Sequence, residues 1–118
     1  MKILEVLGAQ GEIRMFRIDE IPDRAKPMEM ENGAYIIGHS ETGHHHVLEA
    51  ERVKVFADPE APQGMTILYA ILESPGELVH LRGHDTHAPH AFEPGDKIMF
   101  RSDREFDPYA ELARRVAD

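Results

Sequence analysis

Alternation of apolar and polar residues with a period of two is the feature that most constrains the fold of this chain. The stretches "KILEVL", "GEIRMFRI", "AYIIGH", "RVKVFA", "MTILYAILE", "ELVHL" and "DKIMFRS" follow it and are rich in β-branched and aromatic residues. Clusters of Gly, Pro, Asp and Asn separate these stretches. The pattern predicts an all-β domain, an antiparallel β-sandwich or small barrel of about seven or eight short strands.

Three segments refine this prediction. "MTILYAILE" is apolar on both faces, so we expect a central strand that is covered on both sides. Residues 18–33, "IDEIPDRAKPMEMENG", carry two prolines and several acids, so we expect an exposed connection. Near the end, Asp107 can cap a helix that begins with a proline. Leu112 and Val116 give that helix an apolar stripe, which predicts one short C-terminal helix over residues 108–116.

Composition and charge limit the class of protein. The length of 118 residues, with 42% hydrophobic and 30% charged residues, fits a single globular domain over residues 1–118. The formal net charge of −9 disfavours binding to nucleic acids and to anionic membranes, because both need concentrated Lys and Arg. The sequence has no apolar run of about 18 residues and no signal-peptide pattern, so we expect a soluble protein that stays where it is made.

Histidine is gathered into two short stretches. Residues 38–49, "GHSETGHHHVLE", contain four of the eight histidines, and residues 80–90, "HLRGHDTHAPH", contain the other four. The chain has no cysteine, so any metal would be held by His and carboxylate side chains.

A metal site is one interpretation of these stretches. His44 and His46 would point to the same side of a strand, and His84 and His87 are three residues apart across an expected turn. These four are the candidate metal ligands, with Zn²⁺ or Fe²⁺ as the candidate cofactor. The alternative ligand set is three of these imidazoles with a carboxylate of Glu41, Glu49 or Asp85. The site requires at least one of the first pair to lie within about 5 Å of one of the second.

The other interpretation is structural. Histidines in such loops can hydrogen-bond backbone carbonyls, or they can line a pH-sensitive subunit contact. No catalytic nucleophile is predicted, because Ser40, Ser74 and Ser102 lie in no G-x-S-x-G motif. Phosphate-binding glycine motifs are absent as well.

One local pattern resembles a known family. The spacing G-x5-H-x-H-x4-E from Gly38 to Glu51 resembles the first cupin motif, and "PHAFEPGD" resembles the wording around the second. The resemblance implies His44, His46, Glu51 and His90 as metal ligands. The chain departs from it at Asp58, where cupins have Gly, and by placing Gly95 and Asp96 after the final His.

A second resemblance extends over nearly the whole chain. The chain is similar to a family of small uncharacterised proteins of bacteria and tailed phages that share a "QGDV…P" opening and "TGHxH", "HxxHxP…PG" and "REY" motifs. The matching positions are Gln10, Gly11, Thr42, Gly43, His44, His46, His84, His87, Pro89, Pro94, Gly95, Arg104 and Glu105. Glu12 replaces the usual Asp and Phe106 the usual Tyr. The resemblance implies no activity, but it implies a phage context, with some members encoded among head genes.

Two functions follow as expectations. The first is a non-enzymatic phage virion accessory protein, a capsid decoration or cement protein, whose histidines stabilise loops or a subunit contact. Its partners would be other copies of itself or the major capsid protein, and it would be found in the virion or in the host cytoplasm during assembly. The alternative is a small cupin-like metal-dependent enzyme or metal-binding module of the cytoplasm, with Glu41 or Glu49 as general base.

Overall fold

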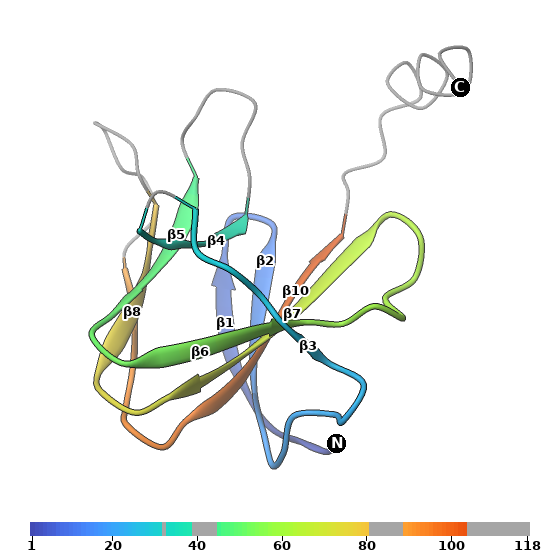
Figure 1. Cartoon of the computed structure of the whole chain (residues 1–118), viewed down its shortest axis with the longest axis horizontal. Coiled ribbons are helices and arrows are strands. Elements are labelled where there is room, and N and C mark those ends of the chain that lie inside the picture. Colours follow the sequence, from blue (N-terminus) through green and yellow to red (C-terminus); the bar gives the residue numbers. More distant parts are fainter. Residues whose placement is uncertain (32, 39–44, 81–88, 104–118) are drawn as a thin grey trace.

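Two antiparallel sheets make up the computed structural model, which describes residues 1–31, 33–38, 45–80 and 89–103 (Figure 1). The larger sheet has the strand order β1 (Ile3–Gln10), β2 (Ile13–Ile18), β10 (Lys97–Asp103), β7 (Met65–Leu72), β6 (Val53–Ala57) and β3 (Lys26–Pro27). The smaller sheet has the order β4 (Tyr35–Gly38), β5 (His46–Ala50), β8 (Gly76–His80) and β9 (His90–Phe92).

The all-β, two-sheet architecture predicted from the sequence is confirmed. The seven alternating stretches form β1, β2, β4, β6, β7, β8 and β10. Three further strands, β3, β5 and β9, are not among these stretches. β3 and β9 have two and three residues, too few to show alternation, and β5 begins with a run of three buried residues that does not alternate. The described ranges contain no helix, and the predicted helix over residues 108–116 lies outside them.

An apolar core fills the space between the sheets. The larger sheet contributes eight buried side chains to it, from Ile13, Met15, Val55, Leu68, Ala70, Leu72, Ile98 and Phe100. The smaller sheet contributes four, from Ile37, Leu48, Leu78 and Phe92. Phe92 meets Phe100 edge to face, with ring centroids 5.8 Å apart, so the aromatic contact joins the two layers. We call this set the main core.

A second apolar cluster lies on the other face of the larger sheet. Its buried members are Ile18, Tyr69 and Met99, and half-buried Phe16, Ile21, Ala25, Phe56 and Ile67 pack against them. On β7, Leu68 and Ala70 belong to the main core, whereas Tyr69 between them belongs to the second cluster. The expected burial of this central strand on both faces is therefore confirmed.

The connection between β2 and β3 covers part of this second cluster. Most of its residues are exposed, as expected, but Ile21 and Ala25 pack onto the sheet. Arg24, between them, pairs with Asp58 just after β6. The predicted exposed connection is therefore confirmed for most of its residues, and the ion pairs of Arg24 with Asp58 and Glu60 hold it on the sheet.

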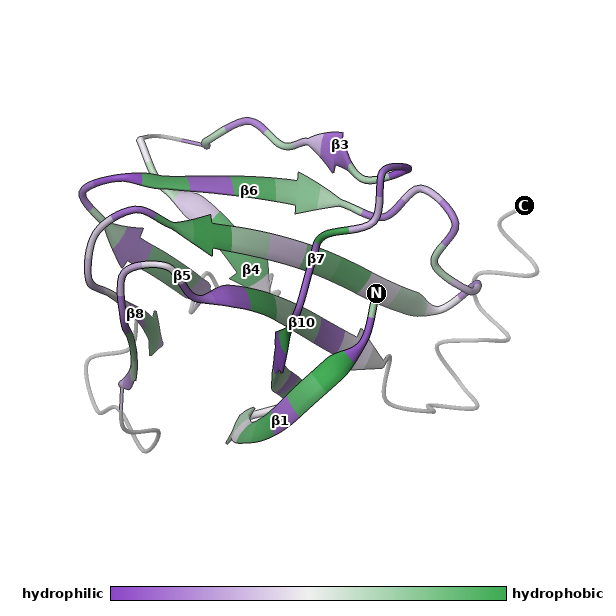
Figure 2. Cartoon of the chain, turned by 90° about the horizontal axis from the view of Figure 1, so that it is seen from below, coloured by the Kyte–Doolittle hydropathy of each residue, from purple (hydrophilic) through white to green (hydrophobic). Residues whose placement is uncertain are grey.

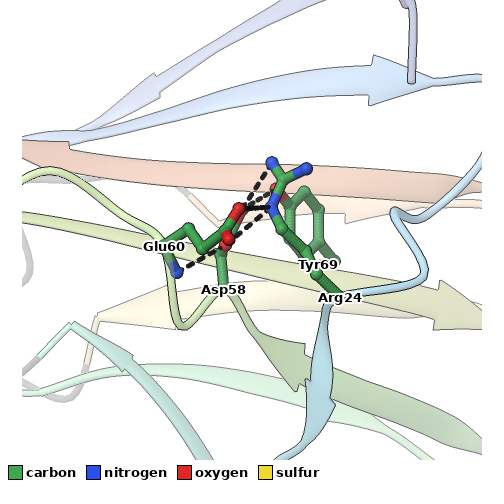
Figure 3. A network of polar contacts seen from close by, with 4 residues as sticks. All are labelled: Arg24, Asp58, Glu60 and Tyr69. Atoms are coloured by element: carbon green, nitrogen blue, oxygen red, sulfur yellow. Dashed lines mark hydrogen bonds and ion pairs between the residues drawn. The ribbon is translucent and has the colours of Figure 1, made fainter.

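Asp58 is the centre of a polar network on this side of the sheet (Figure 3). Its side chain is 1% exposed and accepts three hydrogen bonds from the Nε and Nη2 groups of Arg24, between 2.9 and 3.2 Å long. The Tyr69 hydroxyl donates to Oδ2 at 2.6 Å, and the backbone N–H of Glu60 donates to Oδ1 at 2.9 Å. A carboxylate that leaves water needs such partners, and here donors face both oxygens.

The network shifts the titration of its members in opposite directions. Hydrogen bonds from Arg24, then from Tyr69 and the Glu60 N–H, outweigh burial and hold the pKa of Asp58 below its usual value. Burial, reinforced by the hydrogen bond to Asp58, raises the pKa of Tyr69 to about 12. The folded protein therefore favours an ionised Asp58 beside a neutral Tyr69.

Asp58→Asn tests whether this carboxylate fastens the connection. Because the folded-state pKa of Asp58 is lowered, its contribution to stability is complete above its ordinary value of 3.8 and is lost as the pH falls through the lowered pKa. We expect the variant to unfold at lower urea concentration than the wild type at pH 7, with the gap shrinking below about pH 4. Glu60→Gln, at an exposed partner of Arg24, is the control and should change little. An equal loss in both variants would contradict the assignment.

Tyr69→Phe removes one buried hydroxyl and keeps the ring in the second cluster. We expect a loss of about 1.5–3 kcal/mol in the free energy of unfolding, because the deleted hydrogen bond reaches a charged group. The wild type should also lose stability between about pH 10 and pH 12, where unfolded Tyr69 ionises before the folded residue does. Denaturant unfolding at pH 7 and pH 11 measures both effects, and a wild-type advantage that does not narrow at pH 11 would count against the raised pKa.

Candidate functional site

The two histidine-rich stretches are attached to the same end of the smaller sheet. The first leads into β5 at His46, and the second leaves β8 at His80. These two residues are directly opposite each other in the antiparallel β5–β8 pair. Strand pairing thus brings together two positions that are 34 residues apart in the sequence.

His46 and His80 form a stacked pair on the core side of the sheet. Their ring centroids are 4.3 Å apart, the rings are within 10° of parallel, and each residue is 9% exposed. Leu48 and Leu78, two residues further along each strand, belong to the main core. Because side chains two apart on a strand share a face, the imidazoles lie at the end of that core.

Gln10 joins this pair from the other sheet. The residue ends β1 and is 2% exposed, and its Nε2 donates to the backbone carbonyl of Leu78 at 2.8 Å. Its Oε1 lies 2.7 Å from Nδ1 of His46. An amide oxygen only accepts, so Nδ1 of His46 must carry the proton of this hydrogen bond. In the neutral ring the lone pair of His46 is then on Nε2, the nitrogen that a metal or a donor would meet.

Two glycines lie close to imidazoles of this region. Gly38 is opposite His46 in the β4–β5 pair, and a Cβ there would approach its Cδ2 to 3.2 Å and Cδ1 of Ile13 to 2.7 Å. Gly8 has a φ of 139°, which L side chains rarely adopt, and a Cβ there would lie 3.6 Å from Cε1 of His90. β1 therefore passes close to the His90 ring, on the side where Gln10 reaches toward β8.

The structure reaches only part of the predicted metal set. His46 is described, whereas His44, His84 and His87 lie outside the described residues, and with them the predicted approach within about 5 Å. The described partner of His46 is His80 from the margin of the second stretch. Within the described ranges, no group of three or more His, Asp and Glu side chains is arranged to hold a metal ion.

Two predicted carboxylates lie away from His46. Glu49 is three residues along β5, so it points to the other face of the sheet, where it is exposed opposite Glu77. Glu51 follows the last residue of β5, about 16 Å along an extended strand from His46. The ligand arrangement that the cupin resemblance implies therefore does not bring Glu51 to His46.

Gln10 was not among the predicted site residues. A glutamine at the end of a strand does not by itself indicate a site, and the "QG" motif of the bacterial and phage resemblance is the one sequence feature that includes it. Its role depends on β1 crossing to the smaller sheet, which local sequence does not encode.

Gln10→Leu tests the link between the sheets and the tautomer of His46. The variant removes the partner of the Leu78 carbonyl and of His46 Nδ1, so we expect a loss of about 1–3 kcal/mol in the free energy of unfolding. In the wild type, nitrogen-detected NMR of the imidazoles should show His46 with its proton on Nδ1 near neutral pH. A proton on Nε2 in the neutral ring would contradict the hydrogen-bond assignment, as would wild-type stability of the variant.

Comparison with known proteins gives a match to one family. No curated protein and no solved structure matches the chain significantly. The sequence model of one family, described as "Domain of unknown function (DUF8820)", matches residues 9–102. The matched range runs from the end of β1 into β10 and includes Gln10, His46 and His80. It is well over half of the 118 residues, so the chain belongs to the DUF8820 family.

Proposed function

We propose that this chain is a non-enzymatic accessory protein of a phage particle, in the role of a capsid decoration or cement protein. The proposal of a non-enzymatic role rests on the burial and internal hydrogen bonding of the His46–Gln10–His80 cluster. All three side chains are at least nine-tenths buried, and both ends of the Gln10 amide are engaged. Such a cluster ties two sheets together at the end of their core.

The sequence predicts no serine nucleophile, and the contacts of the described serines are structural. Ser74 is buried, and its hydroxyl accepts the backbone N–H of Arg52 at 2.8 Å, so it orders the turn between β7 and β8. Ser102 is part of β10, and Ser40 lies outside the described residues. The hydrogen bonds found for serines in the described ranges join Ser74 to backbone groups of Arg52 and Pro75, and none of them involves a histidine.

The particle context is supported by the sequence resemblance to phage proteins and by the physical character of the chain. Decoration proteins are held by neighbours in a shell, which favours a rigid β-rich body. A net charge of −9 suits a surface that faces solvent and avoids the packaged nucleic acid. The partners would be other copies of this chain or the major capsid protein.

One observation favours a second candidate, a metal-binding module. Histidines that bind metals usually donate their other ring N–H to an oxygen acceptor, which fixes the ring and its tautomer. His46 has this arrangement through Gln10, with Nε2 as the nitrogen suited to Zn²⁺ or Fe²⁺. His44, His84 and His87 would complete the ligand set.

The particle assignment is tested on virions. Particles released from a strain that carries the gene are purified on a density gradient and analysed by quantitative mass spectrometry. We expect the chain to co-purify with the major capsid protein in a fixed ratio, as decoration proteins occupy symmetric positions. If the chain is made during phage growth but absent from intact particles, the proposal is wrong.

The metal alternative is tested on the untagged protein by native mass spectrometry with elemental analysis of the same sample. A bound metal would appear at about one ion per chain and would be lost in His46→Ala and His84→Ala. His45→Ala is the matched control, because this neighbouring histidine precedes β5 and is not among the predicted ligands. We expect a metal-free protein, and a stoichiometric metal sensitive to the first two substitutions would favour the second candidate.

A further inference from the structure

Exposed apolar side chains gather at the start of β1. Five large apolar residues are strongly exposed among those the structure describes, and four of them fall within Met1–Val6. Their exposed fractions are 49% for Met1, 45% for Ile3, 56% for Leu4 and 69% for Val6. The fifth, Met30, is 52% exposed and belongs to the connection between β3 and β4. A concentration of this kind marks a contact surface more often than scattered exposed residues do.

The same residues lie on an unpaired strand edge. β1 ends the larger sheet, and its pairing partner is β2. At its far end, Gly8 approaches His90 of β9 and Gln10 reaches Leu78 of β8. From Ile3 to Val6, by contrast, no strand of the described ranges pairs with the outer edge. Backbone N–H and C=O groups on such an edge are a template for another strand.

The apolar surface continues from this edge onto the sheet. Ile3 is opposite Ile18, and Val6 is opposite Phe16, so both share the face that carries the second cluster. Leu4 falls where the pairing with β2 shifts register, at a bulge, and its side chain is more than half exposed. In Figure 2, β1 is largely green at the lower border of the molecule. An added strand would therefore gain apolar contacts together with hydrogen bonds.

The local charge favours a second copy of this chain as the occupant. The chain as a whole carries −9, which opposes self-association, but this edge has no excess of acid. Glu5 is paired with Arg17 on β2, and Lys2 lies at the other end of the segment. An antiparallel pairing that sets Ile3 of one copy opposite Val6 of the other keeps both on one face, and it places Lys2 diagonally from Glu5 of the other copy, a contact that recurs by symmetry.

We propose that two copies of this chain associate through antiparallel pairing of the Ile3–Val6 edge of β1, which extends the larger sheet across a two-fold axis. Standard interfaces use roughly 20–30 residues from each partner, and this edge offers fewer. The dimer is therefore weak and reversible, with half-dissociation at micromolar to submillimolar concentration. The inference gives a surface for the self-association named under the proposed function, but it does not rest on the particle role, since it concerns the start of β1 and needs no other protein.

Sedimentation equilibrium of the full-length protein over a range of concentrations tests the apolar contact. We expect the wild-type mass to rise from monomer to dimer, and Val6→Lys to raise the dissociation constant at least about tenfold, because edge lysines block strand addition. Met30→Lys adds the same charge at a similarly exposed apolar residue and should behave as the wild type. Circular dichroism melts of each variant establish that Val6→Lys remains folded.

A second pair of variants tests the charge arrangement. Lys2→Glu should weaken the dimer, because it places two acids together across the two-fold axis. Lys26→Glu on β3 is the control, since it makes the same charge change at the opposite edge of the sheet and should leave the dimer unchanged. A wild type that stays monomeric at all concentrations would overturn the proposal. So would a dimer unaffected by Val6→Lys, and equal effects of the two lysine substitutions would overturn the antiparallel arrangement.

Discussion

The burial of one face of each sheet against the other is the constraint on which the rest of this structure depends. Leu68, Phe100 and Leu78 all lie on the inner faces of the two sheets. The period of a strand fixes which side chains share a face, so these residues are buried together whenever the sheets pack. Every polar side chain at the end of those inner rows must then find a partner within the protein. The His46–His80 stack and its bond to Gln10 are the result of that requirement. The cluster is thus both the end of the core and the place where β1 is joined to the smaller sheet.

The larger sheet meets a second constraint on its other face. Tyr69 and Met99 point away from the main core, so other residues must shield them from water on that face. The connection after β2 provides this cover with Ile21 and Ala25, while Arg24 supplies the charge that lets Asp58 stay ionised under this layer. Apolar burial alone would hold so short a cover loosely, and the buried carboxylate gives it one defined position. Among the described strands, none pairs with the outer edge of β1 in this sheet, which is the basis of the proposed dimer.

These features bear differently on function. The imidazole pair is buried, stacked and tied to a glutamine, so its described contacts are those of a structural joint. The bond from Nδ1 of His46 also prepares its other nitrogen for a ligand, which keeps the metal-binding alternative specific enough to test. The exposed apolar edge is a feature of a protein that assembles with others. The buried joint and the exposed edge are thus the features on which the proposed role in an assembly depends, and the Nδ1 bond is the feature on which the metal-binding alternative depends.

The sequence by itself determined the all-β class, the position of most strands and the two-sided burial of β7, because alternation and β-propensity act within a few residues. It also marked the two histidine-rich stretches as the unusual feature of the chain. Local pattern could not show that β5 and β8 are neighbours, that Gln10 reaches across from β1, or that Arg24 meets Asp58. Such pairings are chosen by the packing of whole strands against one another, and a one-residue change of register would send His46 to the opposite face. The residue types were therefore fixed by the sequence, whereas their partners were decided only when the two sheets closed over a common core.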